Sequence, residues 1–148
     1  MHVRERDLDL LDYRQIEEFR FQIRRFLTFS ETAAQAAGIE PQQHQALLVL
    51  RAAGTENLPT IGHIAGRLLL KHHSAVGLVD RLQALGLITR RANPNDARQV
   101  LVRLTSKGDR ILHHLSIAHR TELDDTAPRL IEILRSITRR RQEGVPVV

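Results

Sequence analysis

The sequence predicts a mainly helical fold that carries one small antiparallel sheet of two to three strands, and three observations support this prediction. Apolar residues recur every three to four positions through most of the 148-residue chain. Two short alternating stretches, at 87–91 and 99–104, break that pattern and flank the turn-forming sequence Asn-Pro-Asn-Asp. The segment 71–110 holds eight basic and three acidic residues, which matches the net charge of +5 of the whole chain.

The first predicted helix runs over residues 12–37, where the apolar stripe includes Ile16, Phe19 and Ile23 and where Gly38 provides the C-terminal stop. About 25 residues at 1.5 Å each give a length of roughly 38 Å. A helix of that length has little core of its own to cover it in a small protein. We therefore expect its apolar stripe to pack against another chain.

Two further helices are predicted before the charged segment. Pro41 suits the first turn of a helix that continues to about residue 53. Thr60 suits the N-cap of a short helix at 61–68, after a short extended entry at Pro59. A break at 69–71 then separates this short helix from the next one.

The second half of the chain is predicted to hold a helix at 72–85 that Gly86 ends, the two strands, and a helix that Thr105 caps. We expect Pro128 to interrupt that helix, so that a separate last helix carries the apolar residues of 130–137. A short helix, a turn, a helix and a hairpin in this order form the plan of a winged helix-turn-helix.

The helix at 72–85 has one apolar face and one short polar face. The apolar residues Ala75, Leu78, Val79, Leu82 and Leu85 can pack inward, whereas the opposite face carries His73, Ser74, Gly77, Arg81 and Ala84. A face of that kind can enter a major groove, which is about 12 Å wide, and contact base edges. Gly77 costs up to about 1 kcal/mol of helix stability relative to Ala. It would allow close approach either of DNA or of a neighbouring helix, and the sequence does not favour one over the other.

The predicted hairpin is cationic, with Arg90 and Arg91 on its first strand and Arg98 at its tip. A narrow minor groove has a negative potential that attracts arginine, so this hairpin could reach into one. Asp96 could orient the guanidinium of Arg98, and Asp80 on the preceding helix could pair with Arg98. A solvated hairpin without a ligand is the alternative interpretation.

Four motifs in this region stand at specific spacings: Val79-Asp80-Arg81-Leu82, Gly86-Leu87-Ile88, Asn93-Pro94-Asn95-Asp96-Ala97-Arg98 and Leu104-Thr105-Ser106-Lys107-Gly108. Together they resemble the MarR family of bacterial transcription regulators. The resemblance implies a homodimer with interwoven first and last helices, operator DNA as partner and often a small-molecule effector. It also implies that Arg98 is the wing arginine and Asp80 its salt-bridge partner, and that residues 72–74 and 77 read bases. The residues before Val79 depart from the Ser/Thr-rich pattern of the family, so no base preference follows.

These considerations define the expected regions and sites. Residues 1–40 and 109–148 are predicted to form the helical dimerisation region and residues 41–108 the DNA-binding region. The resemblance further implies that an effector, expected to be an aromatic acid, binds between the two regions, with Phe26, Phe29, His44 and Leu47 as candidate lining residues. By sequence alone, the alternative that these four are ordinary core residues is the favoured one. The predicted DNA-contacting residues are Lys71, His72, His73, Ser74, Gly77, Arg81, Arg90, Arg91, Asn95 and Arg98, with Asp80 and Asp96 as salt-bridge partners.

Composition excludes or disfavours several other classes of protein. The chain has no cysteine, which removes disulfides and thiolate metal sites, and it shows no GxSxG, HExxH, P-loop or GxGxxG motif. We therefore expect no enzyme and no cofactor. His72 and His73 point about 100° apart on a helix and cannot easily share a metal, so we expect none. Four Phe, one Tyr and no Trp disfavour single-strand binding.

The expected function is that of a cytoplasmic repressor that binds a palindromic operator as a homodimer. No apolar run approaches the roughly 20 residues that cross a bilayer, and the N-terminus shows no secretion signal. The sequence pI of about 10.9 favours an anionic partner. A dimeric interaction protein that kept the fold without DNA binding is the alternative, and activation in place of repression is also open.

Overall fold

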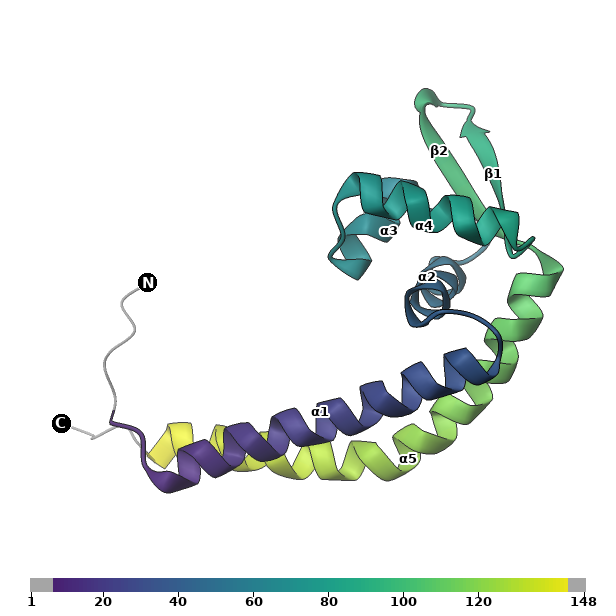
Figure 1. Ribbon diagram of the computed structural model, residues 1–148. Coiled ribbons are helices and arrows are strands. Elements are labelled where there is room, and N and C mark those ends of the chain that lie inside the picture. Colours follow the sequence, from purple (N-terminus) through teal and green to yellow (C-terminus); the bar gives the residue numbers. More distant parts are fainter. Residues whose placement is uncertain (1–6, 144–148) are drawn as a thin grey trace. The chain divides into compact units, whose positions relative to one another are not determined.

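The computed structural model describes residues 7–143 (Figure 1). The elements in chain order are α1 (Leu10–Ala36), α2 (Pro41–Ala52), α3 (Ile61–Leu68), α4 (His72–Ala84), β1 (Ile88–Asn93), β2 (Asp96–Leu104) and α5 (Ser106–Glu143). The chain divides into two compact units, one made of the described residues up to 30 together with those from 119 onward, and the other of residues 31–118. We call the first the helical arm and the second the central unit. The division falls inside α1 and inside α5, at different positions from the predicted region boundaries.

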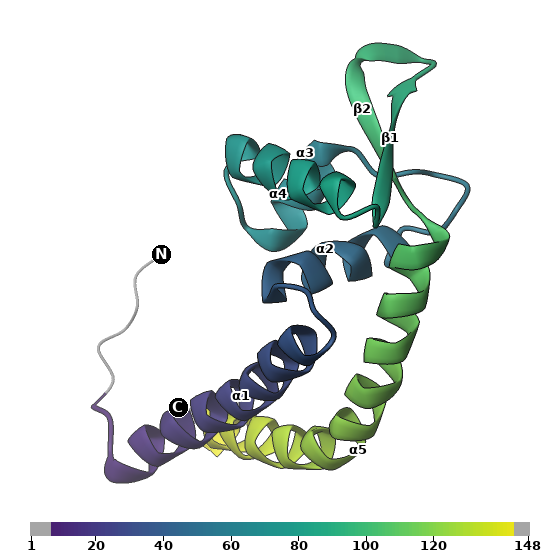
Figure 2. The same ribbon diagram turned by 45° about the vertical axis from the view of Figure 1, so that its right-hand side comes forward.

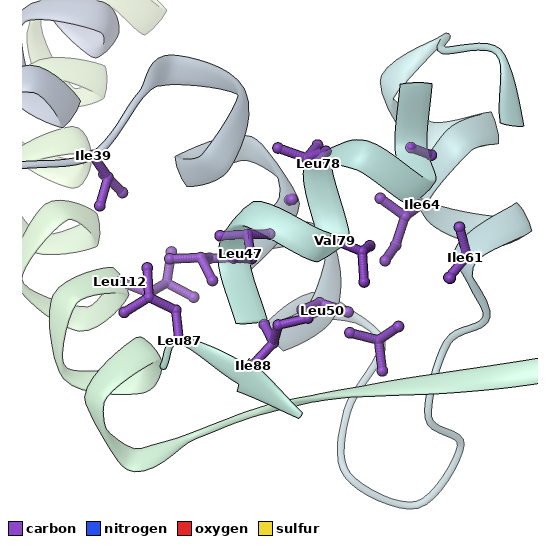
Figure 3. Packing of buried hydrophobic residues seen from close by; sticks show 14 of the residues in the cluster. Ile39, Leu47, Leu50, Ile61, Ile64, Leu78, Val79, Leu87, Ile88 and Leu112 are labelled. Atoms are coloured by element: carbon purple, nitrogen blue, oxygen red, sulfur yellow. The ribbon is translucent and has the colours of Figure 1, made fainter. Parts of the chain in front are cut away.

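The central unit has one hydrophobic core, to which α2, α3, α4, the hairpin and the first part of α5 contribute (Figure 3). Helix α4 buries Ala75, Leu78, Val79 and Leu82, as its sequence pattern predicts. Full burial of a leucine or valine side chain contributes about 1.5–3 kcal/mol, so this face fixes the orientation of the whole helix. Leu85 was also expected to point inward, but it lies beyond the last turn of α4 and is 43% exposed.

The sheet consists of β1 and β2 in antiparallel register, with Ile88 opposite Leu104. The extended segment before α3 pairs with this two-stranded sheet at one residue, because Thr60 forms an isolated antiparallel bridge with Leu101. The backbone N–H of Val102 donates to the carbonyl oxygen of Pro59 at 2.9 Å. The predicted mainly helical fold with a two- to three-stranded antiparallel wing is therefore confirmed.

The predicted helix caps are present in the central unit. The hydroxyl of Thr60 accepts a hydrogen bond from the backbone N–H of His63 at 3.0 Å, and that of Thr105 accepts one from Gly108 at 3.1 Å. Gly38 and Gly86 have φ angles of +81° and +71°, the left-handed conformation that ends a helix most easily at glycine. The caps therefore explain why the elements begin and end where they do.

Two of the motifs singled out in the sequence contact one another at the junction of α4, β1 and α5. The hydroxyl of Thr105 donates to the carbonyl oxygen of Gly86 at 2.6 Å, and its backbone N–H donates to that of Leu87 at 3.0 Å. The ammonium group of Lys107 donates to the carbonyl oxygen of Leu85 at 3.0 Å. Gly108 approaches this turn so closely that an added Cβ would lie 2.2 Å from the oxygen of Leu87. The Leu-Thr-Ser-Lys-Gly motif thus clamps the end of α4 to the start of α5.

In the helical arm, α1 and the second part of α5 lie side by side and antiparallel (Figures 1 and 2). Near one end the guanidinium of Arg140 donates to both carboxylate oxygens of Asp9, one of them at 2.7 Å. At the other end Ser30 and His119 are hydrogen-bonded at 2.8 Å. Among the described residues, no helix is long and apolar enough to cross a bilayer.

The predicted break at Pro128 is wrong, because α5 runs through it from Ser106 to Glu143 as one helix. A proline inside a helix removes one backbone hydrogen bond to the carbonyl four residues earlier. Pro128 and Asp124 are both exposed. Water can therefore hydrogen-bond the carbonyl oxygen that loses its partner, which lowers the cost of keeping the helix continuous.

Candidate nucleic-acid interface

The outward face of α4 is polar at its N-terminal end. Lys71, His72 and His73 are exposed, Ser74 is half-buried, and Arg81 is exposed about two turns further along. Lys71 occupies the N-cap position and makes no side-chain capping hydrogen bond. The carbonyl oxygen of Lys71 accepts from the backbone N–H of Ser74 at 3.0 Å, but its side chain caps no amide, so the amides of His72 and His73 at the positive end of the helix can take an external anion.

Gly77 lies in the middle of this face and has little protein around it. In the part of the chain that the structure describes, an added Cβ would meet only a terminal guanidinium nitrogen of Arg81, at 3.4 Å. Close packing among the described residues therefore gives no reason for glycine at this position, and its contact with DNA stays a prediction.

The turn between α3 and α4 contains a feature that the sequence did not reveal. Leu69 has a φ of +55°, the left-handed conformation that glycine usually occupies, and its side chain is 93% exposed. A non-glycine residue in this conformation costs roughly 1–2 kcal/mol. The residue follows directly on α3 and supplies the sharp turn that lets α4 begin three residues later.

The predicted salt bridge between Asp80 and Arg98 is wrong, since Asp80 pairs with Arg90. Arg90 on β1 is directly opposite Val102, close to the base of the hairpin. Arg98 lies beyond a bulge, because Ala92 pairs with Val100 but Asn93 pairs with Asp96. The three residues between these pairs have no partner on β1, so Arg98 is held at the tip, far along the hairpin from the pair at its base.

Asp96 also has a different role from the predicted one. Its carboxylate accepts a hydrogen bond from the backbone N–H of Arg98 at 3.0 Å. On the other side of the turn, the side-chain oxygen of Asn93 accepts from the backbone N–H of Asn95 at 2.9 Å, and its amide donates to Gln99 at 2.9 Å. These short-range bonds fix the backbone of the tip and leave the Arg98 guanidinium exposed.

The arginines of the wing therefore fall into two groups, one held in an ion pair within the chain and one exposed to a ligand. Arg90 is half-buried and paired, whereas Arg91 and Arg98 are exposed. Within residues 7–143 no ion pair holds either of these two side chains. All ten predicted DNA-contacting residues belong to the central unit, on α4, the turn before it and the hairpin.

The residues predicted for an effector pocket fall in different units. Phe26 and Phe29 belong to the helical arm, where both rings meet the ring of His119 edge-on, with centroids 6.0 and 5.3 Å apart. His44 and Leu47 are buried in the central unit, and Leu47 is part of its core. The pocket stays a prediction. The sequence analysis did not single out His119 for this cluster, because it lies about ninety residues from the two phenylalanines.

Other kinds of site find less support in the described residues. In residues 7–143 no group of three or more His, Asp or Glu side chains is arranged to hold a metal ion. The histidines of α4 and α5 are instead distributed over exposed helix faces or engaged in the contacts described above.

Sequence comparison finds similar proteins among HTH-type transcriptional regulators. A model of the MarR family matches residues 37–99. The chain is 33% identical over 92 residues to the uncharacterized HTH-type transcriptional regulator YcgE of Bacillus subtilis (strain 168), a match that covers 62% of this chain and 58% of that relative. The chain thus matches less than two thirds of the length of this relative.

Solved structures share the fold. Wild-type MarR from E. coli in its apo form is 23% identical with a TM-score of 0.66, covering 89% of this chain and 98% of that one. The S. aureus MepR–DNA complex is 19% identical with a TM-score of 0.60, covering 81% of this chain and 95% of that one. Residues 37–99 therefore resemble the MarR family in sequence, and the chain shares the winged helix-turn-helix fold of these solved structures.

Proposed function

We propose that this chain is a DNA-binding transcription regulator that acts as a homodimer and represses by occupying a palindromic operator. The observation that carries the proposal is the surface formed by α4 and the wing. One unit presents a short polar helix face with an uncapped N-terminus next to a hairpin whose Arg91 and Arg98 are exposed and unpaired within residues 7–143. Duplex DNA provides the matching features, a major groove for the helix and phosphates and a minor groove for the arginines.

In this mechanism α4 enters the major groove by its N-terminal end. His72, His73 and Ser74 reach base edges or phosphates, and Gly77 lets the helix backbone approach closely. Lys71 and the first amides of α4 contact a phosphate, as helix N-termini commonly do. Arg98 extends from the wing into the adjacent minor groove, while Asp80 and Arg90 keep the base of the hairpin in place beside α4.

The homodimer is supported by the surface of the helical arm. Two antiparallel helices cover only one side of each other, and this arm exposes large apolar side chains while it buries the polar Gln15 and Gln22. A second copy would bury these side chains and place two α4 helices for half-sites about 34 Å apart. The exposed apolar residues of the described arm are Leu8, Leu10, Leu11, Tyr13, Ile16, Phe21, Ile23, Leu27, Ile131, Leu134 and Ile137.

The regulation that we propose is release by a small aromatic acid. An effector that binds the DNA-free state better than the DNA-bound state changes the spacing of the two α4 helices and lowers operator affinity. By linkage, DNA and effector then weaken each other by the same factor. Ligand-induced thermal stabilisation that is lost in His44→Ala would support the predicted effector residues, and an unchanged shift would remove His44 from the set.

The test begins with duplexes selected by the purified protein from a random pool, followed by fluorescence-anisotropy titration at several salt concentrations. We expect the logarithm of the affinity to fall steeply and linearly with the logarithm of salt concentration, because phosphate contacts release counterions. Arg98→Ala should weaken binding about tenfold and lower the salt slope by about 1. Arg24→Ala, which removes an exposed charge from the helical arm, is the matched control and should leave affinity nearly unchanged.

Oligomeric state is measured on the same samples by light scattering. A dimer for both variants would show that Arg98→Ala acts on DNA contact and not on assembly. A monomeric wild-type protein, or equal affinity of Arg98→Ala and wild type, would contradict the proposal and favour an interaction protein of the same fold.

A further inference from the structure

We propose that His72 and His73 bind DNA in their protonated form, so that proton uptake is part of sequence recognition. In this form His73 donates to the major-groove edge of guanine and His72 donates to a backbone phosphate. Both residues belong to the first turn of α4, and both side chains are exposed. The inference rests on the proposed function, because it requires the N-terminal end of α4 to contact duplex DNA.

The two imidazoles are not engaged within the described chain. In residues 7–143 no hydrogen bond, ion pair or ring contact involves the side chain of His72 or His73. A neutral imidazole has one N–H donor and one acceptor nitrogen, whereas an imidazolium has two donors. No contact of the described residues fixes a tautomer, so the bound partner decides which form is held.

The surroundings of the pair are cationic and nearly free of carboxylates. Helices α2 and α3 and strand β1 pack against α4. Besides the pair itself, the charged or titratable residues of these four elements and of the N-cap of α4 are His44, Arg51, His63, Arg67, Lys71, Asp80, Arg81, Arg90 and Arg91. Asp80 is the one carboxylate in this set, and it lies about two turns beyond His73 and pairs with Arg90. These elements thus offer no free carboxylate to an imidazolium, whereas duplex DNA carries a negative charge about every 1.7 Å of its axis.

The two histidines have different targets because they point in different directions. Successive residues of a helix are about 100° apart. Gly77 follows His73 by four residues and shares its face, and an added Cβ at Gly77 would meet only the end of Arg81 among the described residues. The backbone can therefore approach the floor of a groove here, which brings His73 to base edges. His72 is in line with the half-buried Val76, at the border of this face, where the phosphates of a groove lie.

Guanine is the base that suits an imidazolium best. Its major-groove edge presents two acceptors, N7 and O6, whereas adenine adds an amino donor and cytosine presents a donor. A neutral imidazole can accept from these amino groups, but an imidazolium cannot. Protonation therefore narrows the set of bases that His73 can bind and favours guanine.

The affinity for a selected duplex is measured by fluorescence anisotropy from pH 6 to pH 8 at constant ionic strength. The complex holds more protons than its free components, so affinity should fall as pH rises, by about tenfold for each histidine. His72→Gln and His73→Gln keep a hydrogen-bonding side chain that does not titrate, and each should remove about half of the pH dependence on a logarithmic scale. His113→Gln, which changes an exposed histidine of α5 in the same unit, is the matched control and should keep the whole dependence.

Two further measurements count the protons and assign the acceptors. Calorimetric titration in buffers of different ionisation enthalpy should show uptake of about one proton per protomer at pH 7 in wild type and less in either variant. Replacing the guanines of the duplex by 7-deazaguanine removes the N7 acceptor and leaves the phosphates unchanged. This replacement should reduce the pH dependence of wild type and of His72→Gln, and it should leave that of His73→Gln unchanged.

The possible outcomes separate this inference from the proposed function. Duplex binding with equal affinity at pH 6 and pH 8, or a wild-type pH profile in both variants, would overturn proton-linked recognition and leave the proposed function standing. A wild-type profile that 7-deazaguanine does not change would overturn the guanine contact of His73. A protein that binds no duplex at any pH would instead contradict the proposed function.

Discussion

Gly108→Ala is the substitution whose effect the structure defines most closely. The new methyl carbon would lie 2.2 Å from the carbonyl oxygen of Leu87 and 3.1 Å from its carbonyl carbon. Both are backbone atoms, so the turn itself has to move. That carbonyl oxygen also accepts the 3.0 Å hydrogen bond from Thr105, which a shift would weaken. Overpacking of this kind costs about 1–3 kcal/mol and a lost hydrogen bond about 1 kcal/mol.

The helix propensity of alanine offsets at most about 1 kcal/mol of this loss. We therefore expect Gly108→Ala to lower the free energy of unfolding by about 2–3 kcal/mol, measured by urea denaturation at one fixed protein concentration. Gly66→Ala is the matched control, because it sits in α3 with no atom within 4 Å of the added Cβ and should gain up to about 1 kcal/mol. Equal stability of Gly108→Ala and wild type would refute the clamp between α4 and α5.

Three further predictions follow from contacts described above. Gly77→Ala should keep or slightly raise stability, since its Cβ meets only the flexible end of Arg81, yet weaken duplex binding in an anisotropy titration; unchanged affinity would mean that α4 does not approach DNA at this point. Hydrogen bonds from Arg140 hold the pKa of Asp9 well below its ordinary range, so the ionised carboxylate stabilises the arm at neutral pH and this stabilisation is lost as pH falls below about 4. Asp9→Asn should flatten that acid dependence of the thermal midpoint, and an identical pH profile would remove the contact as its cause. Pro128→Ala should raise stability by at least about 1 kcal/mol by restoring a helix hydrogen bond, and a loss of stability would show that α5 needs proline there.

The local signals of the sequence predicted most of the fold. Periodicity located α1 to α4 within a few residues, and Thr60 and Thr105 cap the helices for which they were proposed. These features depend on neighbours within one or two turns, which a single sequence displays directly. Pro128 misled the prediction because the cost of a proline depends on whether water reaches the freed carbonyl, and that depends on which side of the helix faces the solvent.

The sequence predicted which residues form the candidate interface, but it did not predict the ion-pair partner of Asp80. The exposed face of α4 follows from its helical periodicity, whereas the partner of Asp80 depends on strand register. The bulge between Ala92 and Asn93 moves Arg98 away from the base of the hairpin and leaves Arg90 beside α4. The left-handed conformation of Leu69 could not be predicted from the sequence, because the position holds leucine and not the glycine that usually indicates such a turn.

The helical arm joins residues that are far apart in the chain, and this has a consequence for biosynthesis. Ser30 meets His119, and Asp9 meets Arg140, across 89 and 131 positions. During synthesis on the ribosome, residues 31–118 can therefore fold before the second half of α5, the partner of α1 in the helical arm, has been translated. The apolar side chains of α1 stay without their intramolecular partner until translation is almost complete. We expect the protein to be most prone to aggregation during this interval, and premature termination after residue 118 to yield a chain with a folded centre and an uncovered first helix.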